Sequence, residues 1–319
     1  MLIVAADIGG TKTRLALADA NNSRHFLYEA CYSSSDFTDF ESMLRAFLKE
    51  CDLTEGRVEV LTLALPGLVS DLSARLTNLP WIIEKQSLKD AFGISKIHFM
   101  NDFQASAIGI DQLQEQDSIV LNTGVLNSAG FDKKTIQVAV GAGTGLGVAW
   151  MQNDILNDEK YACATEGGHI DFAPVDEIQI KLLQFLKQRF DHVSYERILS
   201  GDGLVSIYHF CAGKQYEVSA EWINRQSKKD PVADRAVSLF VQVYGAYIGN
   251  IALLFKPYGG IFITGGIGAK LIEKMQSDLF LDAYLNKGRM RALVEQIPVY
   301  LVTNERIGVL GAMSETVKI

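Results

Sequence analysis

Residues 3–17 read IVAADIGGTKTRLAL, and residues 136–150 read IQVAVGAGTGLGVAW. In each stretch a β-branched, apolar run enters a turn rich in Gly and Thr and leaves as a second apolar run, which is typical of a β-hairpin. Gly10–Thr11 of the first stretch aligns with Gly143–Thr144 of the second. The alternative is a coincidence between two ordinary hairpins. Against it, both turns hold more Gly than a tight reversal needs, and the excess lets a bulky anion approach the backbone.

The size and charge of the chain exclude several classes of protein. Its 319 residues are about twice the span of a typical single domain, which favours two domains. Apolar residues make up 48% and charged residues 21%, so disordered and fibrous classes are excluded. The formal net charge is −8, and no run of five or more Lys and Arg occurs. We therefore expect no nucleic-acid partner.

The cysteines and the apolar segments indicate a cytoplasmic protein. The four cysteines, at positions 31, 51, 163 and 211, match no paired zinc or redox spacing and are interpreted as reduced thiols. The N-terminus has no basic leader, so we expect no signal peptide. Val237–Phe255 is long and apolar but contains Gln242 and Asn250. A membrane-spanning helix would bury those amides in hydrocarbon, so we expect a buried core helix and no membrane association.

Strand and helix patterns alternate between the two hairpins, and helices predominate after the second. The predicted elements are a helix at Phe40–Cys51, strands at Val58–Leu65 and Ile97–Met100, a helix after Asn101, helices at 177–190, 194–199 and 204–211, a long helix ending at Phe255, a strand at Gly260–Thr264 and a helix at 267–275. The last strand reaches its helix through Gly265 and Gly266, which places backbone donors at a helix N-terminus.

The first hairpin turn, DIGGTKT at residues 7–13, is a candidate phosphate loop. Asp7 ends an apolar strand, and the turn supplies two flexible residues and three side-chain donors: Gly9, Gly10, Thr11, Lys12 and Thr13. Such a loop can surround a phosphate group while Asp7 reaches a metal ion. The alternative is a solvated hairpin tip.

The second hairpin turn, GAGTGLG at residues 141–147, has four glycines in seven residues. It resembles a dinucleotide-binding fingerprint, but an apolar strand at 148–151 follows it where that fingerprint requires a helix. A β-turn that binds phosphates through Gly143, Thr144 and Gly145 fits better.

Six motifs in order identify a family resemblance. They are DIGGTKTRLAL at 7–17, NDFQASA at 101–107, GAGTGLGVA at 141–149, EGGHIDFAP at 166–174, HVSYERILSGDGL at 192–204 and FITGGI at 262–267. The chain resembles the ATP-dependent glucokinases of the enterobacterial type, within the superfamily of hexokinase, actin and Hsp70, from Asp7 to the GVLGA segment at 308–312. The resemblance implies an α/β fold of two lobes, the actin-like ATPase (ribonuclease H-like) fold, with an interlobe cleft. It implies a small domain at 1–110 plus 300–319 and a large domain at 111–299.

The resemblance also implies roles for individual residues. In glucokinases the Asp of the NDF motif is the catalytic base, which here is Asp102. Sugar contacts are implied for Asn78, Asn101, Glu166, His169 and Glu196, and ATP contacts for the two glycine turns and for Gly265 and Gly266 near adenosine, with Mg²⁺ at Asp7. Carboxylates, amides and imidazole suit a hexose, whose hydroxyl groups both donate and accept hydrogen bonds. Taken singly, Asp102 is also a good helix N-cap, Glu196 a surface helix residue, and His169 a structural histidine or metal ligand.

Two departures from related families affect these roles. Lys12 stands where many enzymes of this type have Asn, and it either contacts the β- or γ-phosphate or is solvated. ROK sugar kinases carry a zinc-binding cysteine cluster after their EGGH-like motif, whereas this chain has no CxCG pattern. We therefore expect no zinc, which leaves His169 available to the sugar.

The implied reaction is transfer of the γ-phosphoryl group of MgATP to the 6-hydroxyl of glucose, the first step of glycolytic glucose use, by a cytoplasmic homodimer. The alternatives are a kinase for another hexose, such as mannose or an N-acetylhexosamine, a sugar-sensing regulator, and a filament-forming actin relative. A regulator would need a DNA-binding helix pair, and the phosphate loop begins at residue 7. A filament protein has no use for the sugar residues.

Overall fold

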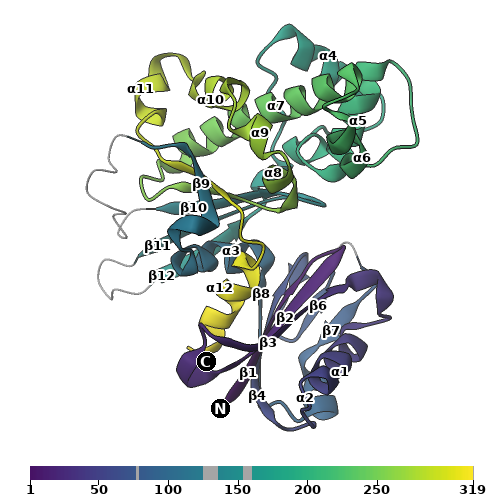
Figure 1. The fold of residues 1–319 in the computed structure, drawn as a ribbon, viewed down its shortest axis with the longest axis vertical. Helices are drawn as coiled ribbons and strands as arrows, with labels where there is room; N and C mark the ends of the chain where they lie inside the picture. The colour runs from purple at the N-terminus through teal and green to yellow at the C-terminus, as the bar shows by residue number, and fades with distance from the viewer. Residues whose placement is uncertain (77–78, 125–135, 154–159, 319) are drawn as a thin grey trace. The chain divides into compact units, whose positions relative to one another are not determined.

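The computed structural model describes residues 1–76, 79–124, 136–153 and 160–318, which form two compact units (Figure 1). Unit 1 comprises Met1–Gln114, Ala162–Ala164 and Asn304–Ile319, and unit 2 comprises Glu115–Tyr161 and Thr165–Thr303. The segment Ala162–Ala164 is a part of unit 1 that the expected domains did not include.

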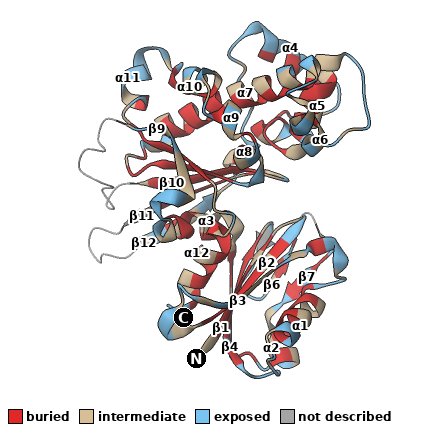
Figure 2. Cartoon of the chain, viewed as in Figure 1, coloured by how far each residue is buried: buried red, intermediate tan, exposed pale blue. Residues whose placement is uncertain are grey.

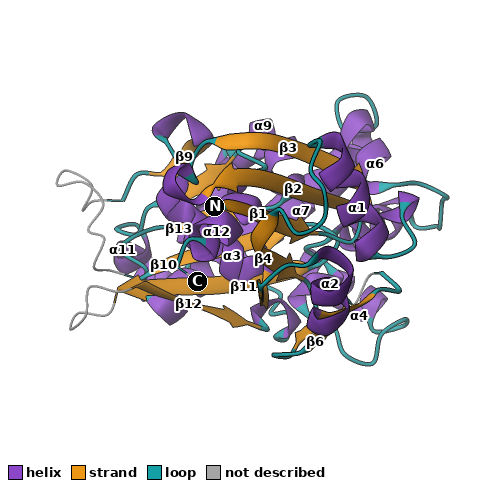
Figure 3. Ribbon diagram, turned by 90° about the horizontal axis from the view of Figure 1, so that it is seen from below, coloured by secondary structure: helices purple, strands orange, loops and turns teal. Residues whose placement is uncertain are grey.

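Unit 1 is built on a five-stranded sheet with the order β3-β2-β1-β4-β8. Its strands are β1 (Leu2–Ile8), β2 (Lys12–Asp19), β3 (Phe26–Ser33), β4 (Val58–Leu65) and β8 (Lys96–Asn101). The first three strands lie side by side and are antiparallel, whereas β4 and β8 run parallel to β1 (Figure 3). A smaller antiparallel sheet contains β5 (Leu68–Val69), β6 (Ser73–Arg75) and β7 (Ile82–Glu84). The predicted first hairpin and the strand at Val58–Leu65 are confirmed.

Helices cover both faces of the five-stranded sheet, and the strand alternation gives each face its own set of side chains. Larger residues such as Val4 and Leu15 pack against α1 (Phe40–Glu50) and α2 (Lys85–Phe92). The other face presents small residues such as Ala5, which pack with α3 (Asp102–Gly109) and α12 (Ile307–Thr316). Figure 1 shows the two helix pairs on opposite sides of the strands. Small side chains on one face bring α12 close to β1 and α3 close to β4.

Glycines bring α3 and α12 into backbone contact. A Cβ added at Gly109 of α3 would collide with the carbonyl oxygen of Ile307, and one at Gly311 of α12 would collide with that of Ala105. Neither neighbour is a flexible side chain that could move aside. The glycines therefore join the segment from Asn304 onward to the N-terminal part of unit 1.

Unit 2 repeats the strand order of unit 1. Its sheet has the order β12-β11-β10-β13-β14-β9, with strands β9 (Ser118–Asn122), β10 (Gln137–Ala142), β11 (Leu146–Asn153), β12 (Lys160–Thr165), β13 (Ile261–Thr264) and β14 (Val299–Val302). The β10–β11 hairpin is antiparallel, β13 and β14 continue parallel to β10, and β9 adds an antiparallel edge. The two similar sequence stretches are thus the first hairpins of two equivalent sheets.

The helices of unit 2 are α4 (Glu177–Leu186), α5 (Gly201–Ala212), α6 (Ala220–Gln226), α7 (Pro231–Phe255), α8 (Gly266–Lys270), α9 (Ile272–Met275), α10 (Asp278–Leu285) and α11 (Arg291–Val294). Two predicted helices differ. The segment 194–199 forms a single 3₁₀ turn at Tyr195–Arg197, because a β-bridge between Asp171 and Ser194 holds its start extended. The predicted helix 267–275 divides at Leu271, whose backbone leaves the helical region.

Helix α7 forms the centre of unit 2. Among the residues that the structure describes, it is the one helix long and apolar enough to cross a membrane. Its side chains are mostly buried inside the unit (Figure 2), where they pack with those of α5 and α10. Gly245 lets the carbonyl of Phe280, on α10, approach α7 closely. Gly249 likewise lets the carbonyl of Tyr284 approach, since a Cβ at Gly249 would lie 2.5 Å from that carbonyl oxygen. The prediction of a buried core helix is confirmed.

We expect Gly311→Ala to lower the free energy of unfolding by about 1–3 kcal/mol, because the methyl group forces α12 away from α3. Gly201→Ala is the matched control, since a Cβ there meets no atom closer than 3.8 Å. Its effect should stay within about 0.5 kcal/mol. Urea unfolding measures both. An unchanged midpoint for Gly311→Ala would contradict the backbone contact between the two helices.

Candidate active site

Polar residues gather at the carboxyl ends of three parallel strands in unit 1. In the sheet register Asp7 of β1 pairs with Ala64 of β4, and Ala64 pairs with Met100 of β8. Asn101 and Asp102 follow directly after Met100. Ligands of open α/β sheets bind at this edge. The fold therefore brings the DIGGTKT loop and the NDF motif to one end of one sheet.

The DIGGTKT loop is a tight turn fastened by a serine that the sequence analysis missed. The N–H of Gly9 donates to the carbonyl of Lys12 at 2.9 Å, and a Cβ at Gly9 would lie 2.8 Å from the same oxygen. The buried Ser34 donates its hydroxyl to the Gly9 carbonyl and its N–H to the Thr11 carbonyl. Its hydroxyl also lies 2.9 Å from that of Thr13, which is fully buried. Thr13 thus holds the loop, while Thr11 and Lys12 are exposed.

The N-terminus of α3 separates the roles of Asn101 and Asp102. Asn101 is the N-cap, because its Oδ1 accepts from the N–H groups of Phe103 at 2.9 Å and Gln104 at 3.1 Å. Asp102 is the first residue of the helix, and its Oδ1 accepts from Phe103 N–H at 2.9 Å. The alternative that Asp102 serves as the cap is wrong. Its half-buried carboxylate lies where the helix dipole favours negative charge.

The surroundings of Asp7 raise the pKa of its carboxyl group. Gly308 of α12 packs against its carboxylate, and a Cβ there would collide with both the carbon and an oxygen. Burial, together with the negative charge of Asp102, raises the pKa of Asp7 to about 7, although Arg14 opposes the shift. Two carboxyl groups that repel each other this way are stabilised by a cation.

The residues present fit Mg²⁺ supplied with a nucleotide better than a resident metal. Within the described ranges, no group of three or more His, Cys, Asp or Glu residues could hold a metal ion. Mg²⁺ commonly takes one or two carboxylates and completes its shell with phosphate oxygens and water. Asp7, with its raised pKa, suits that arrangement.

The glycine turn of unit 2 is held by Glu196. The N–H of Leu146 donates to Glu196 Oε2 at 2.9 Å, and a Cβ at Gly145 would lie 2.6 Å from the same oxygen. The Gly143 carbonyl accepts from the N–H of Gly201 at 2.9 Å. Thr144, at the tip of the turn, is exposed. Glu196 therefore joins the SxER motif to the glycine turn through a charge-assisted hydrogen bond.

The glycines of the two turns in unit 2 serve different purposes. Gly265 has φ +84°, and a Cβ there would lie 2.6 Å from the carbonyl oxygen of Ala142, so the fold itself requires glycine. A Cβ at Gly143 or Gly266 would meet nothing within 4 Å. The backbone at these two positions is open to an approaching group. The parallel pairing of Gly141 with Thr264 places both turns at the same end of the sheet.

The EGGH motif brings two further polar side chains to Glu196. His169 Nε2 lies 3.7 Å from Glu166 Oε2, and His169 Nδ1 lies 4.0 Å from Glu196 Oε1. The Glu166 side chain is 88% exposed, that of His169 57% and that of Glu196 28%. The three groups line one surface of unit 2 with increasing burial toward the glycine turn. Donors and acceptors of this kind can bind a polyhydroxylated ligand.

Buried supports that the sequence analysis missed hold the EGGH turn. Tyr247 of α7 donates its hydroxyl to the Gly167 carbonyl at 2.8 Å. Thr165 donates to the Val148 carbonyl and accepts from the Gly167 N–H. A Cβ at Gly168 would collide with the carbonyl oxygen of Leu146.

The structure divides the predicted residues into two groups, one in each unit. Unit 1 brings together Asp7, Gly9, Gly10, Thr11, Lys12, Thr13, Asn101 and Asp102, and unit 2 holds Gly143, Thr144, Gly145, Glu166, His169, Glu196, Gly265 and Gly266. Asn78 lies outside the described residues.

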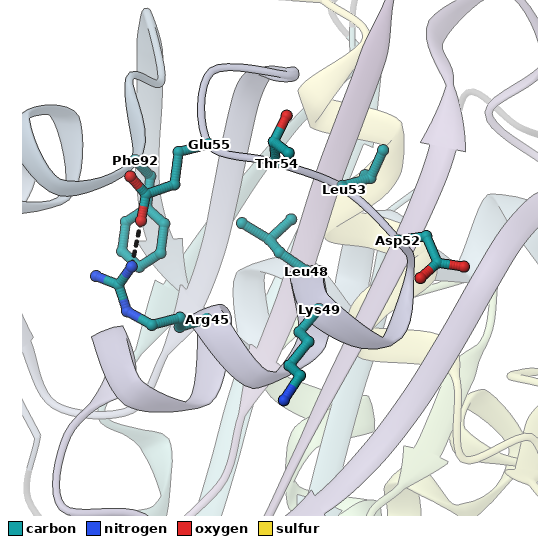
Figure 4. Close-up of a pocket in the computed structure, with 8 residues that line it drawn as sticks. All are labelled: Arg45, Leu48, Lys49, Asp52, Leu53, Thr54, Glu55 and Phe92. Carbon is teal, nitrogen blue, oxygen red and sulfur yellow. Dashed lines mark hydrogen bonds and ion pairs between the residues drawn. The ribbon is translucent and has the colours of Figure 1, made fainter.

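A surface pocket in unit 1 contains none of these residues (Figure 4). It is lined by Arg45, Leu48, Lys49, Asp52, Leu53, Thr54, Glu55 and Phe92. Arg45 pairs with Glu55 and lies 5.0 Å from the centre of the Phe92 ring. Arg45 and Glu55 are already paired with each other, and the glycine turns lie elsewhere in the chain, so this pocket is not the candidate active site.

The repeated strand order, with a glycine turn in each sheet, defines the class as an actin-like sugar kinase fold. A solved ROK family glucokinase from Streptomyces griseus, in complex with glucose and AMPPNP, shares this fold with a TM-score of 0.64 at 20% identity, and the match covers 100% of each chain. The predicted fold class is confirmed.

The chain belongs to the glucokinase family, whose model matches residues 4–318. A glucokinase from Nostoc punctiforme is 35% identical over 98% of this chain and 97% of its own length. The solved glucokinase of an Antarctic psychrotroph is 29% identical, with a TM-score of 0.82 and coverage of 100% and 99%. The activity of the chain is ATP-dependent phosphorylation of glucose.

The raised pKa of Asp7 predicts a pH-dependent effect of Asp7→Asn on stability. Between pH 4 and 7 the folded chain keeps a proton that the unfolded chain has lost, so this group lowers stability as pH rises. Asn cannot ionise, so the stability of Asp7→Asn relative to wild type should increase across that range. Urea unfolding in metal-free buffer at several pH values measures the difference.

Asp39→Asn is the matched control for this effect. Asp39 caps α1, and the hydrogen bond from the Ser42 N–H lowers its pKa. The wild-type carboxylate therefore adds stability as pH rises through the acidic range. The stability of Asp39→Asn relative to wild type should decrease over that range. As pH rises, the stability relative to wild type should therefore increase for Asp7→Asn and decrease for Asp39→Asn. A flat profile for Asp7→Asn would contradict the raised pKa.

Proposed function

We propose that Asp102 is the base that orients the 6-hydroxyl of glucose and accepts its proton as the γ-phosphoryl group moves. A primary hydroxyl is a poor nucleophile at neutral pH, and a carboxylate within hydrogen-bond reach makes it reactive. The observation that supports this role is the position of Asp102 beside the N-cap. Asn101 already caps α3, so the carboxylate of Asp102 is not needed for capping.

We propose that the sugar is bound by Asn78, Asn101, Glu166, His169 and Glu196. The local hydrogen bonds restrict what two of these side chains can offer. The Oδ1 of Asn101 accepts from two helix N–H groups, which leaves its amide nitrogen to donate to a sugar oxygen. The Oε2 of Glu196 accepts from Leu146, which leaves Oε1, on the His169 side, to accept from a sugar hydroxyl.

We propose that ATP phosphates lie against the two glycine turns. The open backbone at Gly143 and Gly266 and the exposed side chains of Thr11 and Lys12 support this assignment. Thr13 contributes by holding the first turn through Ser34. When bound, Mg²⁺ at Asp7 would supply positive charge that neutralises phosphate oxygens. Loss of the Asp7 proton is then favoured, because a cation lowers the pKa of a neighbouring carboxyl group.

The cysteines, the family resemblance and the net charge bear on location and assembly. All four cysteines are free thiols, which agrees with a reducing compartment, so we propose a cytoplasmic enzyme. The family resemblance supports a homodimer, and two-fold pairs are the commonest soluble oligomers. The net charge of −8 supports the absence of a nucleic-acid partner.

Replacing Asp102 by Asn should separate binding from catalysis. Asn keeps the shape of the side chain but cannot accept the proton, so kcat should fall by about 10²–10⁴-fold. The affinities for glucose and ATP should change far less. A coupled assay for ADP measures turnover, and calorimetry measures binding.

Asp176→Asn is the matched control for this experiment. Asp176 caps α4 by accepting from the Gln179 N–H at 2.8 Å, and Asn caps helices about as well as Asp. Its kcat should equal that of wild type. A folded Asp102→Asn variant that also kept most of its turnover would refute the proposed base.

Glu166→Gln and Glu196→Gln should each weaken glucose binding by about 1–3 kcal/mol, because an amide nitrogen replaces one acceptor oxygen and leaves a sugar hydroxyl mismatched. Calorimetric titration with glucose measures the loss. Glu177→Gln, at the exposed start of α4, is the control and should bind as wild type does. A glucose affinity that does not change in either site variant would remove both residues from the sugar site.

A further inference from the structure

A chain of partly buried polar groups connects the segment after α10 with the turn that carries Glu196. Lys287, two residues after α10, donates its Nζ to Asn250 Oδ1 at 2.8 Å and to the Ala246 carbonyl at 2.8 Å. Asn250, on α7, donates its Nδ2 to the hydroxyl oxygen of Tyr195 at 3.0 Å. Tyr195 immediately precedes Glu196 and is 1% exposed. Three elements far apart in sequence therefore meet at one tyrosine.

The hydrogen-bond chemistry permits one orientation of the Asn250 amide. An ammonium group can only donate, so the atom of Asn250 that faces Lys287 must be the acceptor oxygen. The amide nitrogen then faces Tyr195 and must donate to its hydroxyl oxygen. Lys287 thus fixes the direction in which Asn250 holds the tyrosine.

The position of Lys287 is built into α7. A Cβ at Gly249 would collide with Lys287 Cε, so the glycine provides the space through which the lysine stem passes. The ammonium group is half-buried, and this burial lowers its pKa. A partly desolvated cation is costly unless oxygen acceptors surround it, and here two oxygens of α7 accept from it.

Tyr195 in turn fixes the segments that carry the proposed sugar residues. Its N–H donates to the carbonyl of Ile170, next to His169, at 3.1 Å. Its ring packs on Tyr247 with 4.5 Å between centres, and Tyr247 holds the Gly167 carbonyl. On the other side, Glu196 binds the Leu146 N–H of the glycine turn. A shift of Tyr195 would therefore move both Glu196 and the EGGH turn.

We propose that Lys287 and Asn250 are positioning residues that hold Tyr195 and thereby place the Glu196 carboxylate for glucose. The inference rests on the proposed role of Glu196 as a sugar ligand. Side chains that contact a substrate need supports that lock their geometry, and a displacement of about 1 Å reduces rate or affinity greatly. Neither Lys287 nor Asn250 contacts the sugar in this scheme.

The test is a double-mutant cycle between Asn250→Leu and Glu196→Gln, read as kcat/KM for glucose. Leu matches Asn in size but can neither accept from Lys287 nor donate to Tyr195. We expect Asn250→Leu to raise KM for glucose by about 5–50-fold with a smaller change in kcat. In the Glu196→Gln background the same change should have a clearly smaller further effect, because the support then has no carboxylate to place and only the EGGH turn can still shift.

Matched lysine variants separate positioning from general stability. Lys287→Met should raise KM for glucose, as Asn250→Leu does. Lys274 also donates to a residue of α7, but to the Ser238 hydroxyl at 3.1 Å and not to Asn250. Lys274→Met should leave the kinetics unchanged. Asn250→Asp should restore most of the glucose affinity, since Asp accepts from Lys287 and can also accept from the Tyr195 hydroxyl.

The outcomes distinguish the inference from the proposed function. If Glu196→Gln leaves kcat/KM for glucose unchanged, the proposed role of Glu196 fails and the inference fails with it. If Glu196→Gln lowers kcat/KM for glucose but Asn250→Leu does not, only the inference is overturned. The same holds if the double variant loses the full product of the two single effects on kcat/KM. Should Asn250→Leu not fold, Tyr195→Phe takes its place in the cycle under the same criteria.

Discussion

The packing of α12 against α3 and β1 is the contact on which the proposed chemistry of unit 1 depends. Gly311 and Gly109 bring two helix backbones together, and Gly308 on the same helix lies against the Asp7 carboxylate. A methyl group at any of these positions would collide with backbone or carboxylate atoms. The contact lies at Ala105 and Gly109 of α3, the helix that begins at Asp102, and α12 also helps to bury Asp7. The position of α12 thus accounts both for the close helix packing and for the raised pKa of Asp7.

Local sequence patterns predicted the elements that carry their own signal. The two hairpins, the strand at Val58–Leu65 and the buried helix ending at Phe255 follow from alternation, glycine turns and apolar length. The helix expected at 267–275 is divided into α8 and α9, because the backbone of Leu271 leaves helical geometry. The segment Ala162–Ala164 could not be assigned from sequence, since its contacts within unit 1 are distant in the chain.

The chemistry of the candidate site was predicted more fully than its supports. Asp7 was chosen because a carboxylate beside a glycine turn is visible in a single sequence, whereas Asp102 and Glu196 were chosen from the resemblance to glucokinases. Ser34 and Tyr247 were missed, since each reaches its glycine turn from a separate element. The sequence also left open whether Asp102 caps α3, and the hydrogen bonds of Asn101 show that Asn101 is the cap. A motif thus indicates reacting groups, whereas the residues that hold them are found through the fold.

The place of α12 in the chain has a consequence for synthesis on the ribosome. Residues 304–316 leave the ribosome after all of unit 2, so the strands of unit 1 emerge first but wait for their last helix. Unit 2, which is continuous apart from three residues, can form its core while the nascent chain is still growing. During that interval Ala5 of β1 and Gly109 of α3 lack the helix that packs against them in the folded chain. Unit 1 begins to emerge first, but it can complete its fold only after unit 2 has been synthesised.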